Sequence, residues 1–577
     1  MMPLRLALAQ INTTVGDLAG NRAKIIARLN DARAAGVDLV VFPELAITGY
    51  PPEDLLLKPD FVRAASQSLN EIVSATRGLT AIIGCVHVED DLFNAAAIAH
   101  DGQLVGLYKK QFLPNYGVFD ENRYFGAGQQ KQVFSRNGSV FGVSVCEDIW
   151  YPNGPYEGQA ALGGAELLIN LSASPYHLGK GVTRERMIAA RASDNTAFVA
   201  YCNLVGGQDE LIFDGQSLIC GPQGELLARG KQFEEDFIIA DLDFRQVFRA
   251  RLSDPRRRKR TSAAVADYEK ISLRALPTPA KARSTTSIAT PLERVAEVYQ
   301  ALVLGTRDYV HKNGFQKVVL GLSGGIDSAL TAAIAADALG ANNVTGVAMP
   351  TRYSSSHSLE DAEQLAGSLG IEFLKVPIDK TFQSFLDLLK PVFGARPTDL
   401  TEENLQPRVR GTILMALSNK FGSLVLTTSN KSESAVGYST LYGDTAGGFA
   451  VIKDVPKLLV YELSRYRNSI AGREIIPART IEKPPSAELR PDQKDSDSLP
   501  EYDVLDPILC DYVEANRGFE EIVARCGDPD SVRRVIRLVD RNEYKRRQSP
   551  PGVKITSRAF GKDWRLPITN RYQSAFE

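Results

Sequence analysis

A strand that ends in two adjacent glycines and leads directly into a helix constrains the fold of this chain more than any other feature. The apolar run 318–322 precedes Ser323-Gly324-Gly325, and a helical pattern follows. Adjacent glycines let backbone N–H groups approach a ligand closely, and with the helix N-terminus these groups form an anion site. Asp327 lies where its carboxylate could hold a Mg²⁺ ion bridging phosphates. The segment is not a Walker A loop, because no Gly-Lys-Ser/Thr follows.

The residues around this turn alternate between strand and helix patterns. A βαβαβ succession of this kind predicts a doubly wound parallel sheet. The polar, proline-rich stretch 479–503 predicts either an ordered active-site loop or a mobile lid. We expect strands at 317–322, 344–349, 372–377 and 424–428, and helices at 328–339, 359–369 and 405–421.

The first part of the chain shows a second alternation of strands and helices, which predicts a layered α/β domain. Most of its strands are short and rich in apolar residues. We expect strands at 4–10, 39–42, 79–88, 93–98, 104–108, 140–145, 166–170 and 197–203, and helices at 21–35 and 183–193.

The length of 577 residues exceeds what one hydrophobic core usually serves. Between the two patterns the apolar content falls, and proline, serine and arginine become frequent. We therefore expect domains at 1–265 and 291–577, joined by a linker at 266–290. The basic run Arg256–Arg260 favours a solvated segment between domains over a phosphate site, because like charges repel and stay on the surface.

Composition excludes several classes of protein. A net charge of −2 argues against a dedicated nucleic-acid binder, and no apolar run approaches the length of a membrane helix. The first residues become polar too soon for a signal peptide, and the six cysteines show no CxxC spacing. We therefore expect a cytoplasmic protein with reduced thiols.

Three reactive side chains follow three of the expected strands in the first domain. Glu44 follows the strand 39–42, Lys110 follows 104–108 and Cys146 follows 140–145. A lone cysteine at such a position is more often a packed core residue. A carboxylate and a cation at neighbouring strand ends favour a reactive thiol instead. Only five histidines are present, so acid–base chemistry is expected to rest on Glu, Asp or Lys.

These three segments resemble the nitrilase superfamily, which implies an αββα sandwich. By that resemblance Glu44 is the general base, Cys146 the nucleophile and Lys110 the cation that holds the tetrahedral oxyanion. The spacing Tyr-x-Lys-x-x-Leu favours Lys110 over Lys109. Segments 114–121, 170–175 and 206–215 are similar to those of nitrilase-type glutaminases. The similarity implies glutamine contacts at Tyr116, Ser174 and Lys180, and a second carboxylate at Glu121.

The glycine-rich turn resembles the SGGxDS loop of the N-type ATP pyrophosphatases, which adenylylate an acceptor oxygen and release pyrophosphate. The resemblance implies ATP as a substrate and Mg²⁺ as its partner, with Asp327 as one metal ligand. It places ATP at Gly321, Leu322, Ser323, Gly324, Gly325, Ile326, Asp327 and Ser328.

Segments 402–411, 427–438 and 485–489 narrow the similarity to NAD synthetases. That similarity implies that Thr428 contacts ATP and that Glu433 ligates Mg²⁺ or lies beside deamido-NAD. The usual Gly-Asp-Gly-rich turn reads Gly443-Asp444-Thr445-Ala446-Gly447-Gly448 here. The remaining residues implied are Asn404 and Lys545 for deamido-NAD, Lys453 for phosphate charge, and Asp444.

Together the two domains resemble glutamine-dependent NAD synthetases. The function implied is ATP-dependent amidation of deamido-NAD with ammonia released from glutamine, in a homo-oligomer that needs no nucleic acid or membrane. Two alternatives stay open at this point. One is another glutamine-dependent ATP-pyrophosphatase amidotransferase, similar to GMP synthetase. The other is an ammonia-dependent synthetase whose nitrilase-like domain is a non-catalytic scaffold.

Overall fold

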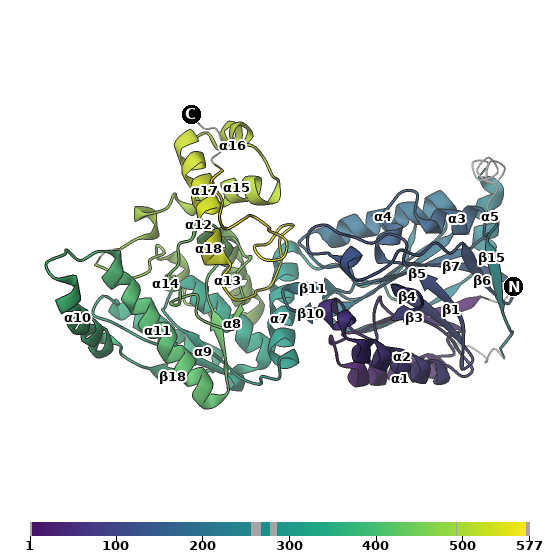
Figure 1. The fold of residues 1–577 in the computed structure, drawn as a ribbon, viewed down its shortest axis with the longest axis horizontal. Coiled ribbons are helices and arrows are strands. Elements are labelled where there is room, and N and C mark those ends of the chain that lie inside the picture. Colours follow the sequence, from purple (N-terminus) through teal and green to yellow (C-terminus); the bar gives the residue numbers. More distant parts are fainter. Residues whose placement is uncertain (1–2, 255–266, 277–285, 492, 573–577) are drawn as a thin grey trace. The chain divides into compact units, whose positions relative to one another are not determined.

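The computed structural model describes residues 3–254, 267–276, 286–491 and 493–572, and the chain divides into two compact units (Figure 1). One unit runs through Gln208 and continues from Ile212 to Leu292. The other comprises Asp209–Leu211 and the chain from Glu293 onward. None of the helices within the described ranges is both long and apolar enough to cross a membrane.

Two sheets form the centre of the N-terminal unit. The first has the order β14-β1-β2-β3-β4-β5, in which β1, β2 and β3 are parallel and the other neighbours antiparallel. The second has the order β13-β12-β9-β8-β7-β6-β15. The strands of the first are β1 (Leu4–Gln10), β2 (Leu39–Val41), β3 (Thr80–Val88), β4 (Leu92–His100), β5 (Gln103–Lys109) and β14 (Asp236–Leu242). Those of the second are β6 (Gln132–Arg136), β7 (Ser139–Val145), β8 (Leu167–Ser172), β9 (Phe198–Asn203), β12 (Leu218–Cys220), β13 (Leu226–Arg229) and β15 (Glu269–Leu273).

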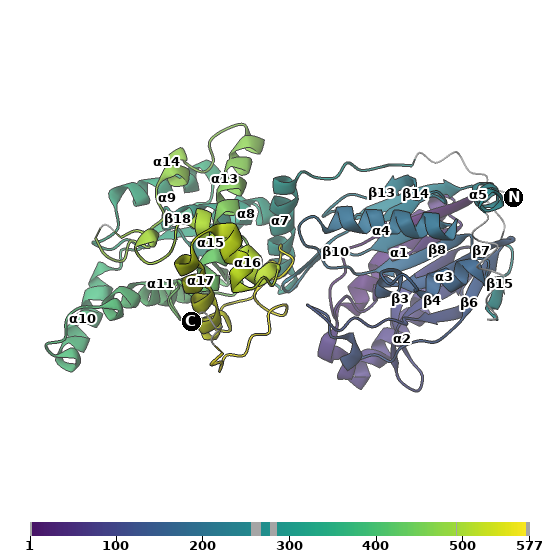
Figure 2. The same cartoon turned by 90° about the horizontal axis from the view of Figure 1, so that it is seen from above.

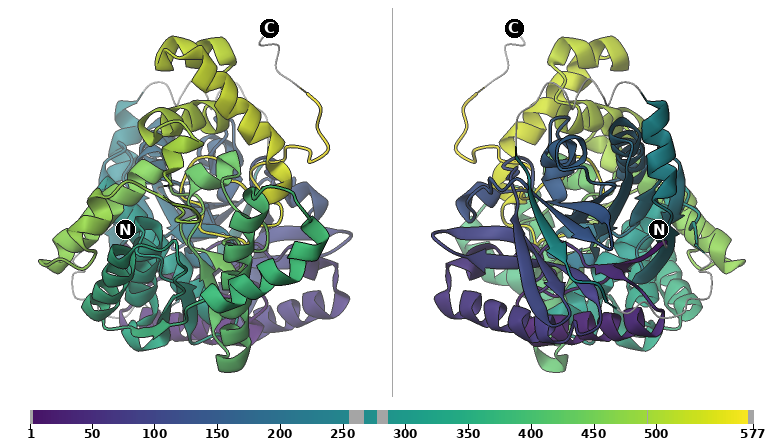
Figure 3. Two further views of the ribbon diagram at one scale, coloured as in Figure 1. Left: turned by 90° about the vertical axis from the view of Figure 1, so that its left-hand side faces the viewer. Right: turned by 90° about the vertical axis from the view of Figure 1, so that its right-hand side faces the viewer.

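Helices cover both outer faces of this pair of sheets. Alternate strand residues such as Leu6 and Val143 pack between the sheets, because successive side chains of a strand point to opposite faces. The opposite faces pack against α1 (Leu18–Ala34) and α2 (Pro59–Ser74) on one side. They pack against α3 (Pro155–Ala161) and α4 (Lys180–Asn195) on the other. The predicted αββα sandwich is therefore confirmed, and the right-hand view of Figure 3 shows the purple helices below the strands.

The interval 266–290, which we expected to be a linker, contains a strand of the second sheet. β15 pairs in parallel with β6, and Glu269 lies opposite Gln132. The strand escaped sequence reasoning because it is a polar edge strand in which only Leu273 is buried. α5 (Arg245–Ser253) precedes it. The basic run Arg256–Arg260 lies outside the described residues.

A hairpin, β10 (Val205–Gln208) and β11 (Leu211–Asp214), forms a separate two-stranded sheet. Short 3-10 helices complete the first unit: η1 (Glu53–Leu57), η2 (Glu121–Arg123) and η3 (Cys146–Ile149).

The C-terminal unit contains one parallel sheet with the order β18-β17-β16-β19-β20. In chain order this is 3-2-1-4-5, so the winding reverses between β16 and β19, and the predicted doubly wound sheet is confirmed. Its strands are β16 (Val318–Gly321), β17 (Val344–Ala348), β18 (Glu372–Lys375), β19 (Leu424–Thr427) and β20 (Phe449–Ala450).

Helices lie on both faces of this sheet. α7 (Arg294–Lys312), α8 (Ile326–Leu339) and α13 (Lys457–Ala471) pack together on one face. On the other, α11 (Leu400–Phe421) contacts β16 and β19 and lies beside α10 (Asp379–Phe393), as Figure 2 shows. The remaining helices are α9 (Ser356–Leu369), α12 (Lys431–Val436), α14 (Ala478–Glu482), α15 (Tyr502–Leu509), α16 (Phe519–Cys526), α17 (Pro529–Arg541) and α18 (Glu543–Arg546). Of these, α12, α15, α16 and α17 share one apolar core.

Candidate functional site

The structure brings two of the three strand-end residues of the N-terminal unit into direct contact. Glu44 follows β2 and Lys110 follows β5, two strands whose carboxyl ends lie at one edge of the first sheet. Lys110 Nζ donates to Glu44 Oε1 at 2.7 Å. Cys146 follows β7 of the second sheet, and the charges of Glu44 and Lys110 both act on its thiol. Lys109 instead pairs with Glu89 at the surface.

Glu121 is the second carboxylate of this cluster. Both of its oxygens accept hydrogen bonds of 2.8 Å from Lys110 Nζ, and Tyr50 donates to it at 3.0 Å. Burial and the neighbouring charge of Glu44 raise the pKa of Glu121 to about 7, although Lys110 acts in the opposite sense. The two carboxylates hold the pKa of Lys110 well above its usual value despite burial, so its amine is protonated.

Cys146 lies at the sharp turn between β7 and η3. Its φ of 42° is in the left-handed region, which side-chain-bearing residues rarely adopt. The thiol is buried, and burial together with the negative charge of Glu44 raises its pKa well above the usual value. At neutral pH the sulfur is therefore a thiol, which needs a nearby base before it can act as a nucleophile.

A close approach between backbones places Glu44 at this site. A Cβ atom at Gly84 of β3 would lie 2.2 Å from the carbonyl oxygen of Pro43 and 2.4 Å from the nitrogen of Leu45. Only glycine leaves enough room for the chain carrying Glu44 to cross β3 here.

Asp148 joins the segment of the nucleophile to the segment of Lys110, and sequence reasoning missed this role. Its carboxylate accepts hydrogen bonds from the backbone nitrogens of Val145, Gln111 and Phe112 at 2.9 to 3.0 Å. It also accepts one from the hydroxyl of Tyr108 at 2.8 Å. The acidic residue two positions after the cysteine was visible in the sequence, but its partners were not.

Two of the three expected glutamine contacts, Tyr116 and Lys180, lie against the segment that begins at Cys146. Tyr116 donates to the carboxylate of Glu147 at 2.9 Å, next to Cys146. The backbone of Ser174 donates to Asn203 at 3.0 Å. Lys180 donates to the carbonyl of Pro175 at 2.7 Å and lies over the ring of Trp150. Tyr116 is 56% exposed, so part of this group faces solvent.

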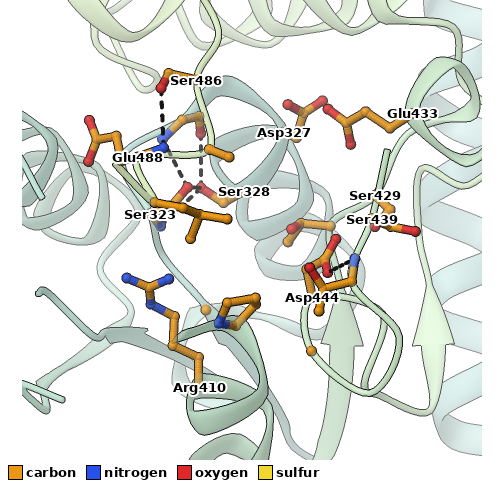
Figure 4. Close-up of a pocket in the computed structure, with 18 of the residues that line it drawn as sticks. Ser323, Asp327, Ser328, Arg410, Ser429, Glu433, Ser439, Asp444, Ser486 and Glu488 are labelled. Carbon is orange, nitrogen blue, oxygen red and sulfur yellow. Dashed lines mark hydrogen bonds between the residues drawn. The ribbon is translucent and has the colours of Figure 1, made fainter. Parts of the chain in front are cut away.

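A cavity of 760 Å³ lies in the C-terminal unit at the carboxyl ends of β16 and β19, where the winding of the sheet reverses. Doubly wound proteins bind ligands at this switch point. Of the residues expected to bind ATP, all but Gly324 line the cavity, including Thr428. Figure 4 labels three of them, Ser323, Asp327 and Ser328.

Gly324 allows the turn to pass close to the backbone of Ser358. Its φ is 76°, and a Cβ atom there would lie 2.1 Å from the carbonyl oxygen of Ser358. The turn itself is braced by Ser328 Oγ, which donates to the carbonyl of Gly325 at 2.9 Å and lies 3.2 Å from Ser323 Oγ.

The carboxylates of Asp327 and Glu433 lie next to one another on the cavity wall (Figure 4). Lys457 Nζ donates to Asp327 Oδ2 at 2.5 Å and to Glu433 Oε1 at 3.4 Å. Burial and the charge of Asp327 raise the pKa of Glu433 to about 8. Asp495 also lines the cavity, so the carboxylates there outnumber their lysine. Carboxylate oxygens are ligands that Mg²⁺ prefers, and this excess of negative charge fits a bound divalent cation.

Lys457 was missed by sequence reasoning, which named Lys453 for the phosphate charge. Lys453 Nζ donates to the carbonyl of Pro550 at 2.7 Å, and its residue is not part of the cavity wall. Lys457 is the first residue of α13, directly after the N-cap Pro456, and it lines the cavity. The immediate neighbours of Lys457 in the sequence gave no signal of this position.

Asn404 and Lys545, which were expected at deamido-NAD, and Asp444 line the same cavity. Asn404 Oδ1 accepts a hydrogen bond of 2.8 Å from Thr440 Oγ1. Asp444 accepts one of 2.7 Å from the backbone of Thr440, and burial raises its pKa to about 6. Lys545 donates to the carbonyls of Gly437 and Ser439 at 2.7 and 2.8 Å.

Part of the polar stretch 479–503 forms one wall of the cavity. Glu488 Oε1 accepts hydrogen bonds from Ser358 at 2.6 Å and from Ser355 at 3.2 Å, which tie this stretch to α9. Arg410 of α11 also lines the cavity, and burial lowers its pKa to about 10. Its guanidinium is a further cation on the cavity wall that sequence reasoning did not name.

Two family models match the chain, one for each unit. The model described as carbon-nitrogen hydrolase matches residues 5–251, and the model described as NAD synthase matches residues 298–549.

Known proteins match over nearly the full length. Glutamine-dependent NAD(+) synthetases of Thermotoga maritima and Aquifex aeolicus are 51% and 50% identical, over 99% of this chain and all of theirs. The structure of the glutamine-dependent NAD+ synthetase from Acinetobacter baumannii in complex with adenosine diphosphate is 44% identical. Its TM-score is 0.74, and the match covers 98% of this chain and 99% of that one.

Proposed function

The chain belongs to the family of glutamine-dependent NAD(+) synthetases, and on that premise we propose how its residues divide the amidation of deamido-NAD between two sites. The N-terminal unit hydrolyses glutamine at Cys146. The C-terminal unit uses ATP to activate the carboxyl group of deamido-NAD, which ammonia then converts to the amide.

Glutamine hydrolysis begins with transfer of the thiol proton of Cys146 to Glu44. The sulfur attacks the side-chain amide carbon of glutamine, and the oxyanion that forms is stabilised by the ammonium group of Lys110. Collapse of this intermediate breaks the C–N bond, and the proton on Glu44 leaves with ammonia. Water, deprotonated by Glu44, then cleaves the thioester and releases glutamate. Tyr116, Ser174 and Lys180 hold the amino-acid end of glutamine.

The second site joins the carboxylate of deamido-NAD to the α-phosphorus of ATP. Pyrophosphate leaves, ammonia attacks the adenylylated carboxyl carbon, and AMP leaves. The loop Ser323–Ser328 and the N-terminus of α8 hold the phosphates, with Thr428 beside them. Lys457 and Arg410 stabilise the negative charge that develops at phosphorus. Asn404, Glu433, Asp444 and Lys545 contact deamido-NAD.

We further propose that Asp327 and Glu433 hold Mg²⁺, which when bound neutralises phosphate charge. Their position on the cavity wall and the local excess of carboxylates support this assignment. A homo-oligomer and a cytoplasmic location are the corresponding proposals from the sequence. A bound adenine nucleotide in the relative from A. baumannii supports ATP as the substrate of this site.

The observation that carries the proposal is the presence, in one chain, of the buried Glu44–Lys110 pair beside Cys146 and of the phosphate cavity beneath the Ser323–Ser328 loop. The test compares wild type with Cys146→Ala for NAD formation from deamido-NAD and ATP. We expect Cys146→Ala to lose activity with glutamine and to keep it with ammonium chloride. Loss of both activities would contradict two separable sites.

A further inference from the structure

Asn94 is a buried polar residue in an otherwise apolar strand. It belongs to β4 and shares its face with Ala96 and Ile98, which pack into the core between the two sheets. Its side chain has no solvent exposure. A buried amide is costly unless its polar groups find partners, so the contacts of Asn94 indicate why it is there.

Asn94 contacts all three members of the charged cluster. Its Nδ2 donates to Glu44 Oε1 at 2.7 Å and reaches Glu121 Oε2 at 3.4 Å. Its backbone carbonyl accepts a hydrogen bond of 2.8 Å from the backbone nitrogen of Lys110. Asn94 thus contacts Lys110 through its backbone. Through its side chain it contacts both carboxylates that bind the ammonium group of Lys110.

The direction of the amide follows from its surroundings. Asn94 Oδ1 is buried and has no hydrogen-bond partner within the described part of the chain. Reversing the amide would place this acceptor against the oxygens of Glu44 and Glu121, which is repulsive. Leaving a buried acceptor unpaired is itself unfavourable. In this arrangement Asn94 Oδ1 goes without a hydrogen bond within the described part of the chain, and Nδ2 donates to the carboxylates.

We propose that Asn94 is a positioning residue for glutamine hydrolysis, which fixes Glu44, Glu121 and Lys110 relative to one another. The inference rests on the proposed role of Glu44 and Cys146 in that reaction. Asn94 does not contact glutamine in this scheme; it acts through Glu44.

The charges around Glu44 explain why a neutral donor is needed. One ammonium group faces two carboxylates, and burial with the charge of Glu44 already raises the pKa of Glu121 to about 7. A hydrogen bond from a neutral amide favours the charged form of a carboxylate without adding another charge. The titratable groups that face this cluster from the neighbouring segments include Tyr50, Cys146, Glu147 and Asp148.

The test uses two variants with side chains close in shape to asparagine, Asn94→Leu and Asn94→Asp. We expect Asn94→Leu to lower kcat for glutamine hydrolysis by about 10- to 100-fold with little change in KM. An amide donor favours the charged form of a carboxylate, so its loss should move the acid limb of the kcat/KM profile to higher pH. Asn94→Asp should lose more activity, because it adds a third carboxylate.

Asn195→Leu is the matched control, since Asn195 is also buried but its side chain donates to the backbone carbonyl of Arg191 at the end of α4. Activity with ammonium chloride should stay at the wild-type level in all three variants. The inference is overturned if Asn94→Leu leaves kcat and the acid limb unchanged, or if Asn195→Leu loses as much glutamine hydrolysis as Asn94→Leu. Neither result would overturn the proposed function. Full glutamine hydrolysis by Cys146→Ala overturns the proposed function and the inference with it.

Discussion

Lys110 Nζ lies 2.7 Å from Glu44 Oε1, and both side chains are fully buried. The same ammonium group binds the two oxygens of Glu121. A buried charge is stable only when it is paired, so this lysine has both a structural and a chemical task. Its pKa is held well above the usual value by Glu121 and Glu44 against the effect of burial, which keeps a permanent cation next to Cys146.

Lys110→Met should abolish most glutamine hydrolysis. Losing the cation at the oxyanion is expected to lower kcat by about 10²- to 10³-fold. It should also lower the free energy of unfolding of this unit by about 3 to 5 kcal/mol, since two buried carboxylates lose their counterion. Glutamate release and thermal unfolding measure the two effects. Lys109→Met is the matched control: Lys109 pairs with Glu89, and its loss should change kcat by less than about twofold.

Glu44→Gln should separate the acidity of the thiol from its reactivity. The pKa of Cys146 is raised first by burial and then by the negative charge of Glu44. Removing that charge lowers the pKa, so the pH profile of alkylation of Cys146 by iodoacetamide should move to lower pH. Glutamine hydrolysis should nevertheless fall by about 10²- to 10⁴-fold, because the general base is gone. An alkylation profile that stays in place or moves to higher pH would contradict this electrostatic account. Glu89→Gln serves as the control and should leave the profile unchanged.

Lys457→Met should inactivate the synthetase site and spare the glutaminase site. Lys457 donates to Asp327 and Glu433 on the cavity wall, whereas Lys453 is bound to the carbonyl of Pro550. We expect NAD formation with ammonium chloride to fall by about 10²-fold or more in Lys457→Met. Lys453→Met should lose far less of this activity. Equal losses of activity in the two variants would contradict the assignment of the phosphate charge to Lys457 in place of Lys453.

Gly324→Ala should disable the phosphate loop through a steric clash. The added Cβ would lie 2.1 Å from the carbonyl oxygen of Ser358, at a residue whose φ is 76°. Gly340→Ala is the control for a positive φ without a steric clash. Gly340 has a φ of 84° and open space around its Cβ position. ATP affinity, measured by isothermal titration calorimetry, should fall at least about tenfold in Gly324→Ala and stay near wild type in Gly340→Ala. Similar affinities in the two variants would exclude the clash as the cause.

Much of this molecule follows from patterns of neighbouring residues. Alternating strands and helices predicted an α/β architecture in both units, and Ser323-Gly324-Gly325 predicted the turn at the switch point. Glu44 and Lys110 were found because each follows an expected strand and because their segments resemble the nitrilase superfamily. β15 was not found, because a short polar edge strand has no apolar run to mark it.

The residues that escaped prediction are those whose task depends on a partner far away in the chain. Lys457 is 130 residues from Asp327, and Asn94 is 50 residues from Glu44. In the sequence Asn94 is one polar residue in an apolar strand, and Lys457 is one lysine among several. Nothing in their immediate neighbours distinguishes them.

Local spacing was enough to identify the reactive groups and the loops that carry them, because strand ends, glycine turns and helix starts are set by residues close in the chain. Which charges meet was settled by the order of the strands and the packing of the two sheets. Burial then determines the rest: an ammonium group between two carboxylates, or a thiol beside a carboxylate, acquires its pKa only after water has been excluded around it.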